Sequence, residues 1–415
     1  MGKPARDAGT SHQMEVGMRI TDIRCVELTG TMEDPDVFWE ERLIRPVDIY
    51  PQFRTEGPSF LPRSGDGAYR MHSIFIQVET DDGVGGTGGP IPLEQAVLVQ
   101  RVLKPLLIGA DPLATELCWD VLYRAQVHGR KGLDMMAISA LDCALWDLKG
   151  RHFGVPVWQL LGGPVRDRIP AYASALGYSL EPDRAAERAR GFADEGYTAT
   201  KWFPRHGPQD GRAGLDRNVA LARTLREAVG DDVDIMIDAW MSWDVPYTLR
   251  VADRVRELGI RWLEEPVQPD RIDSYAAITR QISTGTAIAG AEHEYTRFGL
   301  HQLMQVRAMH VYQPDTYWAG GITEMLKIAA LASAYDVQLI PHGHSVPANA
   351  NFSFAQPAPL VPLIEYLVKW NVIHQWFLAH PVRPEGGYVM PPQQSGLGMD
   401  LDEAKIESRR ELHFD

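Results

Sequence analysis

Three carboxylate residues at nearly equal spacing are the first feature of this chain that could do chemistry. Asp238, Glu264 and Glu292 lie 26 and 28 residues apart, each at the end of a short apolar run. That interval is about one strand-and-helix unit of a (β/α)₈ barrel, in which roughly 250 residues are shared among eight units. Acids at the ends of successive barrel strands face one mouth, where they repel each other unless a hard divalent cation lies between them. The spacing therefore predicts a metal site, with Mg²⁺ as the favoured ion, although a single acid at a strand end can equally be a helix cap.

A histidine and an aspartate follow the next apolar runs. Asp315 closes HVYQPD, and His342 closes VQLIPH. An aspartate on a neighbouring strand can accept from one imidazole nitrogen, which fixes the tautomer and raises the basicity of the other nitrogen. The pair is predicted to be a general acid/base, the alternative being a helix-capping aspartate and an unrelated histidine. His344, two residues further on, is a rival for the same role.

A lysine lies on a strand that precedes the three acids. Lys201 and Phe203 are two residues apart and point the same way, with Trp202 opposite. A lysine inside a barrel mouth is costly unless it meets an anion. Lys201 is therefore predicted either to neutralise a substrate carboxylate or to pair with one of the three acids.

The elements that position these residues recur along the second part of the chain. Short apolar runs separated by helical patterns predict eight strands, at 171–176, 198–203, 234–240, 260–265, 287–292, 310–315, 337–342 and 363–367. Eight parallel strands close a barrel with a packed interior. The last predicted strand carries a further polar residue, Glu365.

The first part of the chain has a different pattern of apolar residues. Residues 20–28 and 72–80 alternate like half-buried strands, and 135–150 have apolar residues at helical spacing. We therefore predict a mobile leader over 1–17, an α+β capping domain over 18–150 and a barrel over 151–380. The tail, 381–415, is predicted to return to the capping domain, and the long stretch at about 30–60 to form a lid.

Composition narrows the partners. The chain has 415 residues, and 41 basic against 55 acidic residues give a net charge of −14, which argues against nucleic acid or an anionic membrane as the main partner. Three well-separated cysteines, Cys25, Cys118 and Cys143, indicate reduced thiols in a cytoplasmic protein. No apolar stretch approaches the roughly 18 residues of a membrane span, and the leader lacks the apolar core of a signal peptide. The GVGGTGG run lacks the ending of a phosphate loop and is predicted to be a turn and strand.

Several long stretches give the chain a resemblance to the enolase superfamily, and within it to the mandelate racemase group. It is most similar to the rhamnonate dehydratases. The stretches that carry the resemblance are ALDCALWDLKG, VWQLLGG, HGPQDG (206–211), DAWMSWDVPY (238–247), AEHEY (291–295), QPDTYWAGGIT (313–323) and IPHGHSV (340–346).

The resemblance implies a fold of the α/β class, a modified TIM barrel with an α+β N-terminal capping domain and a specificity lid. It implies that the three spaced acids bind Mg²⁺ and that His342, oriented by Asp315, is the general acid/base. It implies that Glu365 helps to hold the substrate near the developing enolate. Candidates for substrate contact are the lid arginines, Arg54 ahead of Arg45 and Arg42, and His293 of AEHEY; the alternative for each arginine is a solvated loop face. A symmetric homo-oligomer is also implied.

The chain departs from the family pattern at three positions. Phe203 replaces the second lysine of a K-x-K pair, Trp240 stands where mannonate dehydratases have a histidine, and Ala291 replaces a glycine. A racemase needs an acid/base group on each face of the carbanion, and Phe203 leaves the second face with no obvious base except Lys201. Elimination needs only one face if His342 acts twice.

The predicted function is therefore a Mg²⁺-dependent sugar-acid dehydratase of the L-rhamnonate type, which removes the C2 proton and eliminates the C3 hydroxyl to give a 2-keto-3-deoxy acid. The alternatives are an epimerase, racemase or cycloisomerase on the same scaffold, and a dehydratase of another acid such as lyxonate or mannonate. A non-catalytic barrel that binds sugar acids as a sensor is the alternative from another class.

Overall fold

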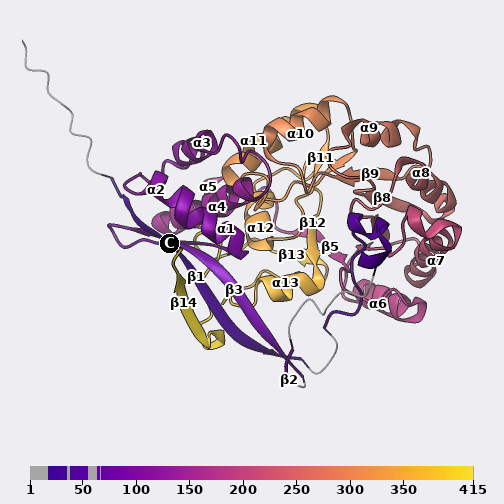
Figure 1. Ribbon diagram of the computed structural model, residues 1–415, viewed down its shortest axis with the longest axis horizontal. Coiled ribbons are helices and arrows are strands. Elements are labelled where there is room, and N and C mark those ends of the chain that lie inside the picture. The colour runs from indigo at the N-terminus through magenta and orange to yellow at the C-terminus, as the bar shows by residue number, and fades with distance from the viewer. Residues whose placement is uncertain (1–16, 35–37, 55–62, 66, 415) are drawn as a thin grey trace, which may run out of the picture.

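The computed structural model describes residues 17–34, 38–54, 63–65 and 67–414. An antiparallel sheet with its helices lies beside a larger unit in which helices surround a curled parallel sheet (Figure 1). Within the described ranges, no helix is long and apolar enough to cross a membrane. The predicted leader lies outside the described residues, apart from Gly17.

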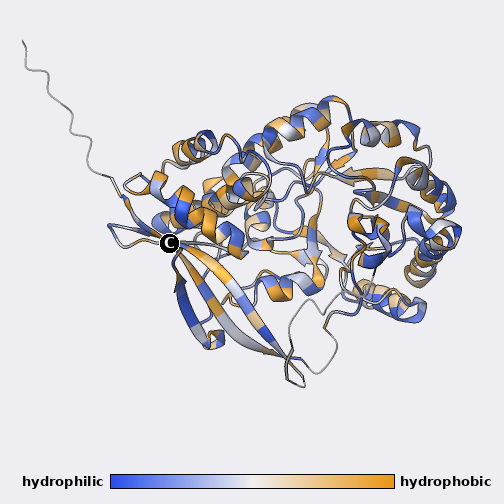
Figure 2. Cartoon of the chain, viewed as in Figure 1, coloured by the Kyte–Doolittle hydropathy of each residue, from blue (hydrophilic) through white to orange (hydrophobic). Residues whose placement is uncertain are grey.

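The antiparallel sheet has the strand order β14-β1-β3-β2, with β4 paired to β3. Its strands are β1 (Ile20–Glu33), β2 (Arg63–Gly65), β3 (Ala68–Thr80), β4 (Gly86–Ile91) and β14 (Ser408–Leu412). β1 and β3 are longer than predicted because apolar residues continue to alternate beyond the predicted ends, and the buried Met32 and Tyr69 still pair across the ladder. The alternation is visible as bands of colour along these strands (Figure 2). The GVGGTGG run forms a turn and the start of β4, as predicted.

The helices of this unit are α1 (Leu93–Leu98), α2 (Lys104–Leu107), α3 (Thr115–Ala125), α4 (Leu133–Phe153) and α5 (Val157–Leu160). The helical pattern expected over 135–150 is longer in the structure, because α4 runs to Phe153 and is followed by Gly154, a left-handed C-cap glycine with φ +66°. Gly150 serves packing instead, since a Cβ there would come within 2.5 Å of the backbone of Gly396. All three cysteines are free and buried.

The parallel sheet contains eight strands, as predicted. They are β5 (Ile169–Ser174), β6 (Ala199–Trp202), β7 (Asp234–Asp238), β8 (Ile260–Glu264), β9 (Ala287–Gly290), β10 (Val311–Tyr312), β11 (Gln338–Leu339) and β12 (Ile364–Leu367). The order is β11-β10-β9-β8-β7-β6-β5-β12, so the last strand returns to pair with the first, and a short β13 (Tyr388–Val389) adds to β5. The predicted fold class is confirmed.

The helices around the sheet follow their strands in sequence. They are α6 (Pro182–Asp194), α7 (Gly211–Val229), α8 (Val245–Arg254), α9 (Ile272–Gln281), α10 (Thr296–Gln305), α11 (Gly321–Tyr335), α12 (Val346–Phe354) and α13 (Val368–His374).

A layer of buried apolar side chains fills the inside of the barrel. Each strand, or the residue next to it, contributes one member: Tyr172, Ala199, Met236, Trp262, Ala289, Val311, Ile340 and Leu363. The barrel is therefore a packed core, not a pore, and the side chains above this layer form the floor of its mouth.

The sixth and seventh strands end earlier than predicted. β10 stops at Tyr312 and β11 at Leu339, so Asp315 and His342 lie three residues beyond their strands. Pro314 and Pro341 explain the difference, because proline has no N–H to donate to a ladder.

Candidate active site

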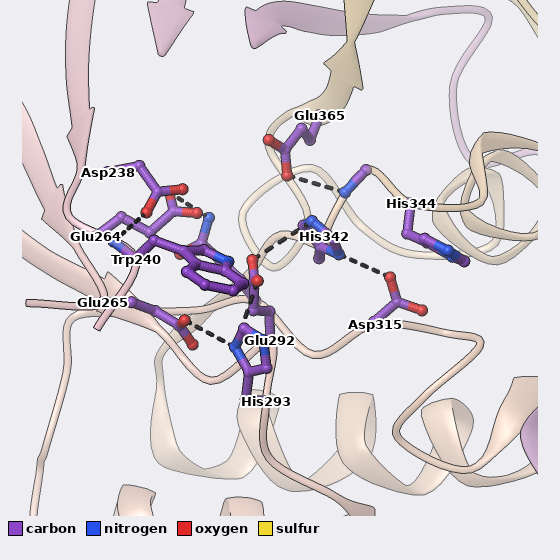
Figure 3. A network of polar contacts seen from close by, with 12 residues as sticks. Asp238, Trp240, Glu264, Glu265, Glu292, His293, Asp315, His342, His344 and Glu365 are labelled. Carbon is purple, nitrogen blue, oxygen red and sulfur yellow. Dashed lines mark hydrogen bonds and ion pairs between the residues drawn. The ribbon is translucent and has the colours of Figure 1, made fainter. Parts of the chain in front are cut away.

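A layer of polar residues lies directly above the apolar layer. Because strand side chains alternate, the residue two positions further along faces the same interior. Those residues are Ser174, Lys201, Asp238, Glu264, Gln313, His342 and Glu365. All of them are buried. The mouth of the barrel therefore has a strongly charged floor, and Figure 3 shows Asp238, Glu264, Glu292 and His342 close together there.

The three spaced acids lie together. One carboxylate oxygen from each of Asp238, Glu264 and Glu292 lies within 4.8 Å of the other two. Glu292 does not follow this alternation, because the residue two positions after Ala289 is Ala291. Ala291 adopts φ +82°, a left-handed conformation that costs a non-glycine residue about 1–2 kcal/mol. This turn brings Glu292 to the cluster.

The electrostatics of these acids show an excess of negative charge. Burial raises the pKa of Asp238 to about 6, of Glu264 to about 8 and of Glu292 to about 7. These values already include the neighbouring carboxylates, which raise the pKa as burial does, and the Lys201 ammonium, which opposes the rise without cancelling it. Three hard oxygen donors that repel one another fit a cation such as Mg²⁺.

Lys201 pairs with the acids, which was one of its two predicted roles. Its Nζ lies 3.2 Å from Asp238 Oδ2 and 2.7 Å from Glu365 Oε1, and it also bonds Glu264. Burial lowers the pKa of Lys201, but these carboxylates outweigh burial and hold it well above the usual range. The Phe203 ring lies 5.4 Å from the same Nζ, on the side that a second lysine would occupy.

Glu365 is held at two points. Besides Lys201, its second oxygen accepts the Gly343 backbone N–H at 2.9 Å. Burial raises the pKa of Glu365, but Lys201 and His342 lower it more, so that the net shift is downward. Glu365 is therefore ionised, with the Lys201 ammonium 2.7 Å from one of its oxygens, and Figure 3 shows it on the same side of the mouth as His342.

The predicted histidine–aspartate pair is formed. His342 Nδ1 lies 2.8 Å from Asp315 Oδ2, so the imidazole donates to the carboxylate and its Nε2 is directed at the acids. That Nε2 lies 3.4 Å from Glu292 Oε2. Burial lowers the pKa of His342, but Glu292, Asp315 and Glu365 together raise it to about 10. The pair thus presents one basic nitrogen to the mouth from one side.

His293 lies on the outer side of the acids. Its Nδ1 is 2.8 Å from Glu265 Oε2 and 3.3 Å from Glu292 Oε1, and its ring lies beside those of Trp240 and Trp318. Glu265 is therefore an ion-pair partner of His293. Glu265, Glu292 and His293 also form a second group whose ligand atoms lie within 4.8 Å.

His344 does not share the facing of His342. Its ring contacts those of Trp370 and His374, with the His374 centroid 4.5 Å away (Figure 3 shows His344 on the far side of His342 from the acids). Nδ1 of His344 and Nε2 of His374 are buried and have no hydrogen-bond partner within the described part of the chain. The geometry therefore favours His342 over its rival.

The buried His344 and His374 are expected to lower the stability of the protein in acid. Burial lowers the pKa of His374 to about 3, and burial together with His374 lowers that of His344 to about 3, from 6.5 in the unfolded chain. The free energy of unfolding keeps the full contribution of these neutral histidines above pH 6.5. As the pH falls from 6.5 towards 3, that free energy decreases by about 1.4 kcal/mol per pH unit for each histidine. Urea unfolding from pH 7 to 4.5 should show a shallower pH dependence for His374→Gln than for the wild type. The exposed His301→Gln is the control, and equal slopes for His374→Gln and wild type would contradict the prediction.

Of the lid predicted at about 30–60, residues 30–33 belong to β1, residues 38–54 are anchored on the barrel, and 35–37 and 55–60 lie outside the described residues. Lys369 Nζ donates to Glu40 Oε2 at 2.8 Å, and Glu40 N–H donates to the Gly177 carbonyl at 2.8 Å. A Cβ on Gly177 would come within 2.7 Å of the Trp39 ring, so that the glycine permits this close approach.

The lid arginines contact the lid itself. Arg42 pairs with the buried Asp48 at 2.6 Å, and Arg45 donates to the Phe53 carbonyl. Arg54 donates to the Asp48 carbonyl at 2.7 Å and reaches Asp210, after the second barrel strand, at 3.6 Å. Substrate contact by Arg54 and His293 stays a prediction.

Two residues around Glu264 were missed by the sequence reasoning. Gln313 Nε2 donates to Glu264 Oε2 at 2.9 Å, and Trp262 Nε1 donates to the same oxygen at 2.8 Å. A signal was present, because Trp262 lies two residues before Glu264 and Gln313 two before Asp315. The prediction used only polar residues at the end of an apolar run, whereas Trp262 and Gln313 lie inside their runs.

Comparison with known proteins agrees with this geometry. Residues 184–405 match the family model for the enolase C-terminal domain-like fold, and residues 66–162 match that for the mandelate racemase / muconate lactonizing enzyme N-terminal domain. The chain belongs to the enolase superfamily, in its mandelate racemase and muconate lactonizing enzyme group. The family predicted from the sequence is confirmed.

Its relatives include enzymes with a stated reaction. An L-rhamnonate dehydratase from Saccharopolyspora erythraea is 34% identical over 412 residues, which cover 96% of this chain and 100% of that protein. The crystal structure of rhamnonate dehydratase from Gibberella zeae complexed with Mg has a TM-score of 0.80 and 32% identity, covering 94% and 96% of the two chains. The 3,6-anhydro-D-galactonate cycloisomerase from Zobellia galactanivorans has a TM-score of 0.75 and 27% identity, covering 94% and 100%. The predicted class, a hydro-lyase, agrees with the dehydratase names.

Proposed function

We propose that this chain is a Mg²⁺-dependent dehydratase of a sugar acid, with L-rhamnonate as the first candidate. The observation that carries the proposal is the one-sided arrangement of the mouth. The His342–Asp315 pair lies on one side of the acid cluster, and Phe203 occupies the position from which a second lysine would serve the other face. Lys201 is engaged by three carboxylates.

Asp238, Glu264 and Glu292 would hold the Mg²⁺. When bound, the ion supplies positive charge that stabilises the enediolate formed as C2 loses its proton. His342 removes that proton through Nε2, while Asp315 holds the ring and stabilises the imidazolium. The C3–O bond then breaks, the hydroxyl leaves as water with the proton returned by His342, and the resulting enol becomes the 2-keto-3-deoxy acid. Lys201 would stabilise the negative charge that develops on the substrate, and Glu365 would help to hold the substrate near the developing enolate.

The test is a panel of sugar acids incubated with the protein and Mg²⁺. L-rhamnonate is expected to give a product that reacts with semicarbazide and is lighter than the substrate by one water. The panel includes lyxonate and mannonate, because the residues named above act near C2 and C3 and do not select among sugar acids that differ at other hydroxyl groups. Semicarbazide-reactive product from none of these acids would contradict the proposal.

A cycloisomerase is the second candidate, because the Zobellia galactanivorans enzyme has the same fold over nearly the whole chain. An isomerisation leaves the mass unchanged, so mass spectrometry of the product separates the two candidates. An epimerase likewise gives a product of unchanged mass. The homo-oligomeric state and the cytoplasmic location predicted from the sequence stay predictions.

A further inference from the structure

Helix α4 carries the ALDCALWDLKG stretch, and its polar side chains are buried together with its apolar ones. Ser139, Asp142 and Asp147 are all at most 1% exposed. Buried polar atoms need partners, because leaving one unsatisfied costs more than the bond itself contributes. The partners of Ser139 and Asp142 lie in the barrel, 181 residues away in the sequence.

These partners are the first N–H groups of α11. Gly320 N–H donates to Ser139 Oγ at 2.8 Å, and Thr323 N–H donates to Asp142 Oδ2 at 3.0 Å. A helix leaves its first N–H groups without partners inside the helix, and Gly320, the N-cap residue, has no side chain to satisfy them. The capping domain therefore supplies the N-terminal cap of a barrel helix.

Three more hydrogen bonds fasten the same segment to the capping domain. Trp146 Nε1 donates to Thr323 Oγ1 at 2.8 Å, and Trp119 Nε1 donates to the Gly320 carbonyl at 2.8 Å. The Gly89 N–H of β4 donates to the Tyr317 hydroxyl at 3.1 Å. The segment 317–323 is thus held from one side at five points.

The fit depends on a glycine. Gly321 has φ +76°, and a Cβ there would come within 2.3 Å of Asp142 Oδ2. A residue with a side chain would be strained at this φ and would push the helix start away from Asp142. Gly321 therefore permits the approach that the cap requires.

The aspartate of the acid/base pair, Asp315, lies two residues before this segment. Asp315 Oδ1 accepts the Tyr317 N–H at 2.6 Å, and the Asp315 carbonyl accepts the Ala319 N–H at 2.7 Å. The Trp318 ring, between these two residues, lies 5.1 Å from the His342 ring. A shift of the start of α11 is therefore passed to the Asp315 carboxylate through one tight turn.

We propose that Ser139 and Asp142 are positioning residues for the Asp315–His342 pair. The capping domain then does more than cover the mouth, because it sets the distance and the angle at which Asp315 meets His342. This inference rests on the proposed function, in which His342 moves the C2 proton.

Asp142→Ala tests the inference, with Asp147→Ala as the matched control. Both aspartates lie on α4 and are fully buried, but Asp147 accepts from the Thr87 and Leu397 N–H groups and not from the start of α11. A misplacement of about 1 Å at a catalytic group can cost about 100-fold in rate. We expect Asp142→Ala to lower kcat and the rate of C2-proton exchange with solvent deuterium by about tenfold or more, with KM unchanged. Asp147→Ala should lower the thermal midpoint and leave both rates per folded molecule within about twofold of wild type.

A conservative variant and a milder one complete the design. An asparagine side chain keeps an acceptor for the Thr323 N–H, so Asp142→Asn should restore most of the rate. If Asp142→Ala does not fold, Ser139→Ala takes its place, since it removes only one acceptor from the same segment. The inference is overturned if the folded variant exchanges the C2 proton at the wild-type rate, or if Asp147→Ala loses as much rate as Asp142→Ala. Absence of turnover in the wild type would contradict the proposed function instead.

Discussion

His342→Asn is expected to abolish turnover and, with it, the exchange of the substrate C2 proton with solvent deuterium. His342 Nε2 is the basic nitrogen that the pair presents to the mouth, and Asp315 fixes the tautomer through Nδ1. General acid/base groups contribute about 10²–10⁴ to a rate, and here one residue would serve both proton removal and proton return, so a loss at the upper end of that range is expected. Asparagine keeps a polar group of similar reach in the position, so the fold should be retained. Proton NMR in D₂O measures the exchange directly.

His344→Asn is the matched control for this experiment. It removes a histidine only two residues away, but one whose ring packs against Trp370 and His374. It should retain most of the exchange rate, since its ring nitrogens do not face the acids. Exchange that persists in His342→Asn and disappears in His344→Asn would assign the base to the rival histidine.

The layered order of the mouth could be predicted from the sequence because strand geometry is simple. A residue that faces the interior is followed two positions later by another that does so. Asp238 therefore faces the interior like Met236, and Glu264 like Trp262. Apolar runs of the right length and number also predict eight strands. Composition and period therefore suffice for the fold class and for most of the charged floor.

Glu292 shows where this reasoning ends. The two-residue rule places Ala291 inward, and only the left-handed conformation of Ala291 brings Glu292 to the cluster. Nothing in an alanine predicts φ +82°, because L-residues avoid that region. The sequence interval from Glu264 identifies Glu292 as a candidate ligand. It does not predict the left-handed backbone conformation that turns Glu292 towards the cluster.

The lid shows a second limit. The length and composition of the segment predict a covering loop, and its arginines are candidates either for substrate contact or for a solvated loop face. Within the described residues, Arg42 and Arg45 bond Asp48, which is buried inside the lid. The partner of a long, flexible cation depends on which anion the fold places within reach, and local sequence carries little information about that.

Glu264→Gln is expected to remove tight Mg²⁺ binding, and Glu265→Gln to leave it in place. Two groups of ligand atoms share Glu292: one adds Asp238 and Glu264, and the other adds Glu265 and His293. Glu264 belongs to the floor of the mouth, where Lys201 and two neutral donors hold its oxygens in place. His293, a member of the second group, lies 2.8 Å from Glu265. Burial lowers the pKa of His293, but Glu265 and Glu292 raise it to about 9, so that its Nδ1 offers a proton and no lone pair to a metal. The first group is therefore the better site for a hard cation.

The thermal midpoint measures this without relying on activity. A ligand that binds only the folded state at 100 times its Kd adds about 2.7 kcal/mol of stability, so Mg²⁺ should raise the midpoint of the wild type and of Glu265→Gln. Glu264→Gln loses one anionic ligand, and a loss of at least about 1.4 kcal/mol in binding energy would weaken Kd tenfold or more. Its midpoint should then respond little to Mg²⁺ at the same concentration. The opposite pattern, a response in Glu264→Gln and none in Glu265→Gln, would move the cation to the His293 side of Glu292 and place it away from the basic nitrogen of His342.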